Sequence, residues 1–521
     1  MALSGAEILA LVRQEFAELL GVPVDDQNFF ELGGRSVDAA RLSVRLQRAL
    51  DRPVPLQLIL RNPQPSTLGA ALAEAPEPAA PAAEPELTDL TVWPVTGTQE
   101  RVVLRDEEHR RTGKPPYIRT SFWCAQLPGT LDADALQYAV EALVDRQTAL
   151  RTTYAVEDGR VVAHVHPDAA PKVESLDFRD EGLDAAVKHA TSSADTAFDR
   201  RELPRLRVIS SDTGADGTLL SVVIDHIVAD GDAISIAVAD LAELYTARVE
   251  GREPRLEPLR ITFGDWVARQ QTPEGRRRRL ELIGFWAPSV AENAFYPTAR
   301  LPFARSEPLP DTFMGARHLH RFPAEVVAGM RELARQLRTT PYTVQLASLY
   351  AHLYRITGES DITVLVPDNN RAGADEENLV GWMATTMALR LRLRPAGGFR
   401  QTVTDVHDMV LSAMDYRGIA FGEVTDALSG GRRTKPVDVI RVSPTMPVTP
   451  PRFGDLAATE VSLPFTSAGL GLSMWIRETD EELEVTLVHG LENYTEAAGR
   501  DFLTGWATTA GAIVTSPDQP L

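Results

Sequence analysis

A histidine at the end of an apolar run offers the clearest candidate for chemistry in this sequence. The run Leu219 to Ile224 is strand-like and leads into Asp225-His226-Ile227-Val228-Ala229-Asp230-Gly231. A histidine holds or moves a proton near neutral pH, a buried carboxylate needs a cationic partner, and a glycine permits a close backbone turn. The plainer alternative is a buried strand that ends in a turn at Asp230-Gly231, with His226 as a hydrogen-bonded polar residue. Both interpretations fit the six residues from His226 to Gly231 when these are taken alone.

A serine that follows two glycines is the second candidate. The stretch reads Phe29-Phe30-Glu31-Leu32-Gly33-Gly34-Arg35-Ser36 and precedes an apolar pattern with helical spacing. Glycines allow a tight turn, and the exposed start of a helix stabilises a phosphate through its dipole and its free N–H groups. The alternative is that Ser36 is only a helix N-cap, a role that does not require the preceding aromatic residues and glycines. The sequence therefore places Ser36 where a phosphate would be stabilised.

The elements that must position Ser36 form a small helical bundle. Apolar residues recur at helical spacing over 8–20 and over 37–50, with a loop between them. A short third helix is expected after Ser66 as its N-cap. Residues 75–88 are rich in proline and alanine and too poor in large apolar groups to fold, which predicts an extended linker. We expect an all-α domain over 1–74 and a linker over 75–91.

The elements around His226 alternate between strands and helices, which indicates an α/β architecture. The strand-like runs are 120–126, 206–210, 219–225, 361–366, 388–393 and 483–488. The helical stretches are 133–146, 234–248, 323–336, 342–357 and 398–414. Because about 430 residues are too many for one core, we expect two α/β lobes, over 92–270 and 271–521, that meet near 265–290. A cleft between lobes is the default position of a ligand site.

Composition argues against several other classes of protein. The chain has 521 residues, 73 acidic against 53 basic side chains and a formal net charge of −20, which disfavours a general affinity for nucleic acid. The run Arg276 to Arg279 is expected to be a solvated helix face. No apolar run approaches the roughly 18 residues that cross a bilayer. Cys124 is the only cysteine, so an intrachain disulfide or a thiolate metal cluster cannot form, and a cytoplasmic location is expected.

Residues 5–74 closely resemble the thiolation (peptidyl carrier) domains of non-ribosomal peptide synthetases. The resemblance rests on the segment Asp26 to Val37, which contains Phe-Phe-Glu-Leu-Gly-Gly-Arg-Ser. In that family the serine after the glycine pair carries a 4′-phosphopantetheine arm, so the resemblance implies that Ser36 is the attachment site. Val37 stands where the family usually has leucine, which is a conservative departure.

Residues 92–521 resemble the condensation domains of the same synthetases, which have the chloramphenicol acetyltransferase-like fold. Besides the His226 motif, further segments match in the family's order: Val95 to Arg101, Arg146 to Tyr154, Phe263 to Val267, and Pro367 to Thr386. The family assigns catalysis to the histidine retained as His226. It implies Arg371 as the partner of Asp230, which we expect to be structural and to form a bidentate pair with it.

The central motif departs from the family at one position, since the usual His-His pair is Asp225-His226 here. Heterocyclisation domains use Asp-x-x-x-x-Asp-x-x-Ser, which Asp225 and Asp230 match in part, but position 233 is alanine. Epimerisation domains carry Ser-Trp where Ala233-Ile234 stand. Asp225, together with Asp232 where the family commonly has a large apolar residue, leaves open an inactive platform that recruits a tailoring enzyme to cargo on Ser36. Ester formation with an alcohol acceptor is a further variant.

The resemblance implies acyl transfer from a phosphopantetheine thioester on Ser36 to an acceptor amine, which gives an amide and a free thiol without a metal. His226 would hold or remove the amine proton. We expect its ring to be accessible at the floor of a tunnel between the lobes. The implied partners are a phosphopantetheinyl transferase, a separate adenylation enzyme or upstream module that loads Ser36, and an amine that is free or bound to a downstream carrier. Neither nucleic acid nor a membrane is an expected partner.

Overall fold

The computed structural model describes most of the chain, and several short ranges lie outside it. The described residues are 4–32, 34, 36–50, 52, 54, 56–74, 91–114, 120–167, 169, 171–291, 301–305, 314–371, 373, 375–429, 440–445, 450–464, 471–479 and 482–521. The linker expected over 75–88 lies outside the described residues, as do Gly33, Arg35 and the side chain of Ser36. Within the described ranges, no helix combines the length and the apolar character that crossing a bilayer requires.

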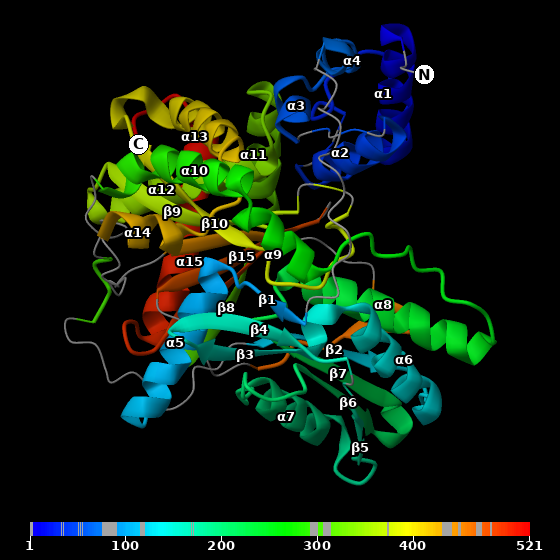
Figure 1. The fold of residues 1–521 in the computed structure, drawn as a ribbon. Helices are drawn as coiled ribbons and strands as arrows, with labels where there is room; N and C mark the ends of the chain where they lie inside the picture. The colour runs from blue at the N-terminus through cyan, green and yellow to red at the C-terminus, as the bar shows by residue number, and fades with distance from the viewer. Residues whose placement is uncertain are drawn as a thin grey trace.

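Four helices form the N-terminal bundle, which stands beside the rest of the molecule in Figure 1. They are α1 (Gly5–Leu20), α2 (Ser36–Leu50), α3 (Leu56–Arg61) and α4 (Pro65–Glu74). A capping box between Ser4 and Glu7 starts α1. The role expected of Ser66 is wrong, because α4 begins one residue earlier. The amide and hydroxyl of Ser66 instead donate to the Asp26 carboxylate, at 2.7 Å each, which ties the loop before α2 to the last helix.

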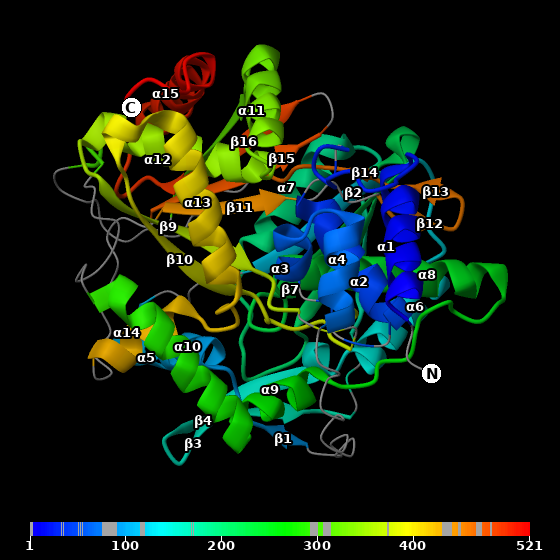
Figure 2. The same cartoon turned by 90° about the horizontal axis from the view of Figure 1, so that it is seen from above.

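The bundle contacts the second lobe through exposed charged side chains. Arg61, at the end of α3, donates to Asp415 at 2.6 Å, and Glu31 lies 3.6 Å from Arg338. Figures 1 and 2 both place the bundle beside α13 (Gly398–Met414). Glu31 belongs to the motif that precedes Ser36, so these ion pairs hold that side of the bundle toward the second lobe.

The first lobe is built on a five-stranded sheet that is covered on both faces. Its strand order is β14 (Thr459–Glu460), β2 (Thr120–Leu127), β7 (Thr218–Asp225), β6 (Leu206–Asp212) and β5 (Val173–Asp177). The helices α6 (Ala133–Arg146) and α8 (Gly231–Glu250) share one apolar core with it, and α7 (Gly182–Ala194) packs in another against Cys124 and Val223. Every residue of β7 is buried. This explains why its sequence is a continuous apolar run rather than an alternating one.

Smaller elements complete the first lobe and connect it to the second. They are β1 (Val92–Trp93), β3 (Thr152–Glu157), β4 (Arg160–Val165), α5 (Gly97–Thr112), α9 (Phe263–Gln271), α10 (Pro273–Ala291), β12 (Arg452–Phe453) and β13 (Leu456–Ala457). The strands β1, β4 and β3 form a separate antiparallel sheet. The arginine run lies on α10 as expected: residues 276–278 are exposed, while Arg279 pairs with Glu423 at 2.6 Å.

The second lobe is built on a six-stranded sheet. Its strand order is β10 (Thr385–Arg392), β9 (Asp361–Asp368), β11 (Ile440–Thr445), β15 (Leu472–Glu478), β16 (Leu483–Gly490) and β8 (Gly315–Arg321). The helices α11 (Ala324–Gln336), α12 (Pro341–Thr357), α13, α14 (Phe421–Ser429) and α15 (Glu496–Thr515) contribute to its apolar core. Trp506 of α15 is fully buried and donates to Ser348 of α12 at 2.9 Å.

Two segments from the C-terminal half of the chain belong physically to the first lobe. Strand β14 pairs antiparallel with β2, with Thr459 opposite Gln126. Leu379, Val380, Trp382 and Met383 pack in the same apolar core as α6 and α8. The chain therefore crosses from the second lobe to the first at both places. Residues 379–384, which we call the crossing segment, are brought in this way to the motif that contains His226.

Candidate active site

His226 lies in the tight turn between the last residue of β7 and the first residue of α8. The backbone N–H of Ala229 donates to the His226 carbonyl at 3.3 Å, and that of Val228 donates to the Asp225 carbonyl at 3.0 Å. The imidazole is partly exposed, and its centroid lies 4.4 Å from that of the Trp382 ring with a 47° angle between the planes. The side chain with candidate chemistry is thus presented by a strand and a helix of one lobe against a tryptophan from the crossing segment.

Asp230 ends this turn as the N-cap of α8 and is 1% exposed. Its carboxylate accepts two parallel hydrogen bonds from Arg371, at 3.1 Å each, and one from the Ala233 amide at 2.9 Å. The amides of Met383 and Ala384 donate to the same carboxylate at 2.9 and 2.8 Å. The structure therefore contains the bidentate pair that we expected, and Asp230 also secures the crossing segment. Because these partners are an arginine and backbone amides of the protein itself, the carboxylate has the environment of a group that positions other residues.

The conformational role expected of Gly231 is wrong. Gly231 has no positive φ, since it is already the first residue of α8, and any residue adopts that backbone conformation. A Cβ at this position would meet no atom within 4 Å. The space beside Gly231 is therefore open, and the tight turn is closed by the hydrogen bonds from Val228 and Ala229 back to Asp225 and His226. The next residue, Asp232, is half exposed and lies 3.9 Å from Arg371.

The crossing segment is also fixed by the motifs around Gln147 and Phe263. Gln147 is buried, accepts from the Val380 amide at 3.0 Å, and donates to the Asn378 carbonyl at 2.9 Å. A Cβ on Gly381 would lie 2.1 Å from the Phe263 ring, so a glycine is needed there for the backbone to approach the ring. The matched segments far apart in the sequence thus converge on residues 378–384, which carry Trp382 to His226.

The opening segment reaches the same turn through Gln99. Its side-chain amide donates to the Ile227 carbonyl at 2.9 Å and to the Tyr154 hydroxyl at 3.0 Å. Burial raises the pKa of Tyr154 above its ordinary value, so this hydroxyl stays neutral. Arg101, two residues further along α5, pairs with Asp426 of α14 at 3.1 Å and links the two lobes. Sequence reasoning identified the segment but not the contact of Gln99 with the turn.

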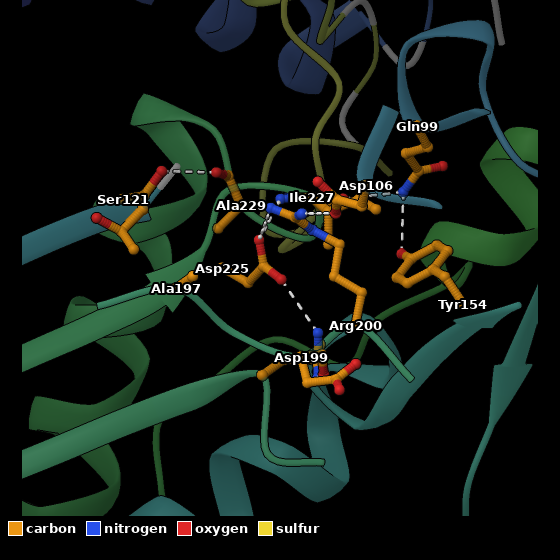
Figure 3. Close-up of polar contacts among 12 residues, drawn as sticks. Gln99, Asp106, Ser121, Tyr154, Ala197, Asp199, Arg200, Asp225, Ile227 and Ala229 are labelled. Atoms are coloured by element: carbon orange, nitrogen blue, oxygen red, sulfur yellow. Dashed lines mark hydrogen bonds and ion pairs between the residues drawn. The ribbon is translucent and has the colours of Figure 1, made fainter. Parts of the chain in front are cut away.

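Asp225, which precedes His226, lies in a buried cluster of charges drawn in Figure 3. It is 0% exposed and accepts from Arg200 at 3.1 Å and from Arg205 at 3.0 Å. Arg200 also pairs with Asp106 of α5. Burial raises the pKa of Asp106 and lowers the pKa of Arg205, because both are removed from water. Sequence reasoning missed the two arginines, although the arginine-rich stretch 200–207 supplies the cations that a carboxylate at the end of an apolar strand requires.

The serine motif of the bundle is described in part. Helix α2 begins at Ser36, as expected. A Cβ on Gly34 would lie 2.3 Å from the Phe29 ring, so the chain enters α2 through a close contact that only a glycine allows. Phe29 is fully buried and packs edge-on against Phe16 at 5.0 Å. The aromatic residues of the motif thus anchor the turn that places Ser36 first in the helix, which fits a phosphate ester at that position.

The tunnel expected above His226 stays a prediction. A cavity of about 90 Å³ lies elsewhere in the first lobe, lined by apolar side chains that include Leu150, Leu203 and Leu206. Around His226 the described structure gives one partly exposed imidazole, buried carboxylates on both sides of it, and open space beside Gly231. Such an arrangement suits one proton transfer, or the holding of one proton, at an aligned substrate.

Comparison with known proteins finds two families in this chain. The family model described as "Condensation domain" matches residues 92–521, and the one described as "Phosphopantetheine attachment site" matches residues 10–72. Phosphinothricin tripeptide synthetase PhsB of Streptomyces viridochromogenes is 30% identical over 437 residues, which cover 82% of this chain and 36% of PhsB. The probable non-canonical nonribosomal peptide synthetase CymA of Salinispora arenicola is 27% identical over 97% of this chain and 7% of its own length. The chain thus spans about a third or less of these curated relatives.

Solved structures show the same fold at low sequence identity. The X-domain from teicoplanin biosynthesis has a TM-score of 0.73 at 19% identity, over 84% of this chain and 98% of that one. The first condensation domain of the calcium-dependent antibiotic synthetase has a TM-score of 0.67 at 19% identity, over 83% and 98%. These likenesses confirm the two lobes of the expected fold class, the chloramphenicol acetyltransferase-like fold. The helical bundle ahead of them is confirmed by the helices α1 to α4 and by the match to the attachment-site family.

Proposed function

Because the chain belongs to the condensation-domain family and carries a phosphopantetheine attachment domain ahead of it, we propose that it forms an amide bond during non-ribosomal peptide synthesis. An acyl or aminoacyl group held at Ser36 is transferred to the amine of an acceptor. The activity is that of an acyltransferase. The observation that carries the proposal is the placement of His226, which is partly exposed in a turn whose neighbours on both sides are buried and bonded.

The prosthetic group would be held by Ser36 through a phosphate ester at the start of α2. When attached, the arm supplies the thiol that carries the acyl group as a thioester. The residues of the chain then align the two substrates, and this alignment supplies much of the rate because a thioester is already activated. The bond that forms is C–N and the bond that breaks is C–S, and the proton leaves the amine for the thiolate.

His226 would hold or accept the amine proton while the amine attacks. Asp230 and Arg371 would act through position, because they bind each other, the start of α8 and the crossing segment. Trp382 limits the space on one side of the imidazole. We assign catalysis to His226 and positioning to Asp230 and Arg371.

The proposal requires partners that supply both substrates. A phosphopantetheinyl transferase would modify Ser36, and a separate adenylation enzyme or upstream module would load it. The acceptor would be an aminoacyl group on a downstream carrier or a free amine. A reaction with an alcohol acceptor would use the same residues and give an ester.

The test is a transfer assay with the whole chain. Ser36 is loaded from a panel of aminoacyl-coenzyme A donors by a broad phosphopantetheinyl transferase, and aminoacyl N-acetylcysteamine thioesters serve as soluble acceptors. The product is detected by mass spectrometry, and His226→Ala is compared with wild type. A product that depends on Ser36 and on His226 supports the proposal. If wild type and His226→Ala form equal amounts of product, the assignment of His226 is wrong.

A second candidate is a platform that recruits a tailoring enzyme to cargo on Ser36. The observation that favours it is the replacement of the first motif histidine by Asp225, whose carboxylate is committed to buried arginines. The fold is shared with the X-domain of teicoplanin biosynthesis, which has been solved in complex with OxyB at a TM-score of 0.72. In this case the transfer assay fails with every acceptor, and a tailoring enzyme binds the chain in a way that does not depend on His226.

A further inference from the structure

Hydrogen bonds hold the backbone N–H and carbonyl groups that directly follow the His226 side chain. The Ile227 N–H donates to Asp225 Oδ1 at 3.2 Å, and the Ile227 carbonyl accepts from Gln99 Nε2 at 2.9 Å. The carbonyl of His226 accepts from Ala229 at 3.3 Å. A peptide plane with both polar groups bonded cannot rotate without breaking them. Asp225 and Ala229 therefore fix the peptide between His226 and Ile227, and Gln99 fixes the next peptide, so that the backbone that carries the His226 ring is held.

Gln99 is itself fixed by contacts from other elements. It is 1% exposed, and its Oε1 accepts from the Thr96 amide at 3.0 Å in the capping box of α5. Its Nε2 donates to the Tyr154 hydroxyl as well as to Ile227. With both ends of the amide bonded and the side chain buried, the side chain has one orientation. Gln99 thus transmits the position of α5 to the turn of His226.

Asp225 is fixed by charge. Its carboxylate faces the guanidinium groups of Arg200 and Arg205, and Arg200 also pairs with Asp106. The side chain of Asp225 is 0% exposed, and those of Arg205 and Arg200 are 1% and 6% exposed. Two carboxylates therefore balance two guanidinium groups in a region removed from water. Loss of one charge leaves its partner buried without compensation.

We propose that Asp225 and Gln99 are positioning residues that clamp the two successive peptides after His226, one each, and that Arg200 and Arg205 make this clamp dependent on a carboxylate at position 225. The inference rests on the proposed function of His226 and deepens it. Asp225→His restores the usual histidine pair of condensation domains, yet in this chain it places an imidazole against two buried guanidinium groups. The substitution should therefore harm the enzyme.

The test compares three variants in the assay described above, at a temperature where circular dichroism shows each to be folded. Gln99→Met keeps the length of the side chain and removes the donors to Ile227 and Tyr154 together with the acceptor of the Thr96 N–H. Asp225→His removes the carboxylate. Asp361→Asn is the matched control, because Asp361 also pairs with arginine, at 2.5 Å from Arg390, but lies at the start of β9 away from the turn. We expect Gln99→Met and Asp225→His to lower kcat by about tenfold or more with KM for the acceptor unchanged, and Asp361→Asn to keep both.

Hydrogen–deuterium exchange of the peptide that contains residues 226–230 gives a readout without activity. We expect faster exchange of this peptide in Gln99→Met and Asp225→His than in wild type and Asp361→Asn. Wild-type kcat in both variants overturns the clamp while the proposed function stands. If wild type itself transfers no acyl group, the proposed function fails, and exchange alone decides: protection equal to that of wild type in both variants overturns the clamp.

Discussion

Removal of the Asp230 carboxylate should destabilise the protein at least as strongly as it slows turnover. In Asp230→Ala, the Arg371 guanidinium, whose side chain is 5% exposed, loses both of its hydrogen bonds to a carboxylate. The amides of Ala233, Met383 and Ala384 lose an acceptor as well. Breaking a buried ion pair from one side costs roughly 3–5 kcal/mol, and the lost N-cap adds about 1 kcal/mol. We therefore expect a loss of about 4 kcal/mol or more.

The assay is thermal unfolding of the whole chain, followed by circular dichroism and calorimetry. For a unit of the size of one lobe, each 1 kcal/mol shifts Tm by roughly 2–4 °C, so the expected fall is about 10 °C. Asp177→Asn is the control, because Asp177 also pairs with an arginine but is 57% exposed, and its loss should leave Tm unchanged. His226→Ala is the second comparator, because it should lower turnover and leave Tm near that of wild type.

The reasoning fails if Asp230→Ala has the same Tm as wild type but loses all activity. In that case the five hydrogen bonds to the carboxylate contribute little to stability, and Asp230 must act on the substrate. A fall in Tm for His226→Ala as large as that for Asp230→Ala would also contradict it, because the turn would then depend on the imidazole itself.

The remaining predictions concern the other groups of the chain. His226→Ala should lower acyl transfer about a hundredfold or more with Ser36 loading intact, as measured by single-turnover kinetics. A broad phosphopantetheinyl transferase and coenzyme A should add one arm by intact mass, and Ser36→Ala should abolish it; one equivalent on the mutant would refute the site. Burial lowers the pKa of His352 to about 4, so its contribution to stability is present above pH 6.5 and is lost as pH falls toward 4. Between pH 7 and pH 5 this amounts to about 2 kcal/mol, so the loss of stability measured by denaturant unfolding should be about that much smaller in His352→Gln than in wild type. Arg61→Glu should release the bundle from the second lobe, and a compensating Asp415→Arg should restore it, as small-angle scattering can measure.

Local pattern predicted most of the elements around the site. The helices expected over 133–146 and 398–414 have those bounds in the structure, and the strand expected over 219–225 begins one residue earlier. These segments are long and strongly periodic, so their own residues determine them. The Asp230–Arg371 pair was also expected, but only from the family resemblance together with the rule that a buried carboxylate needs a cation. Across 141 positions, no local pattern indicates which arginine it is.

The contacts that the sequence did not reveal are those between distant segments. Strand β14 has two residues and pairs with β2 more than 300 positions earlier, and so short a strand leaves no periodic pattern. Gln99 reads as a polar residue of a helix, yet it is buried and bonds Ile227 across 128 positions. Arg200 and Arg205 lie outside the regular elements, where charged residues are usually exposed, whereas here Asp225 keeps them buried. In each case tertiary partners override the local preference.

The turn of His226 depends on two separate groups of buried charges, one on each side. On the Asp225 side the partners come from the first lobe, so that side is complete without the second lobe. On the Asp230 side the partners come from Arg371 and the crossing segment, both of which follow β9 of the second lobe. A shift between the lobes would therefore strain the Asp230 side and leave the Asp225 side in place. Since Trp382 belongs to the crossing segment, the same shift would change the space beside the imidazole, so the surroundings of His226 depend on the relative position of the lobes.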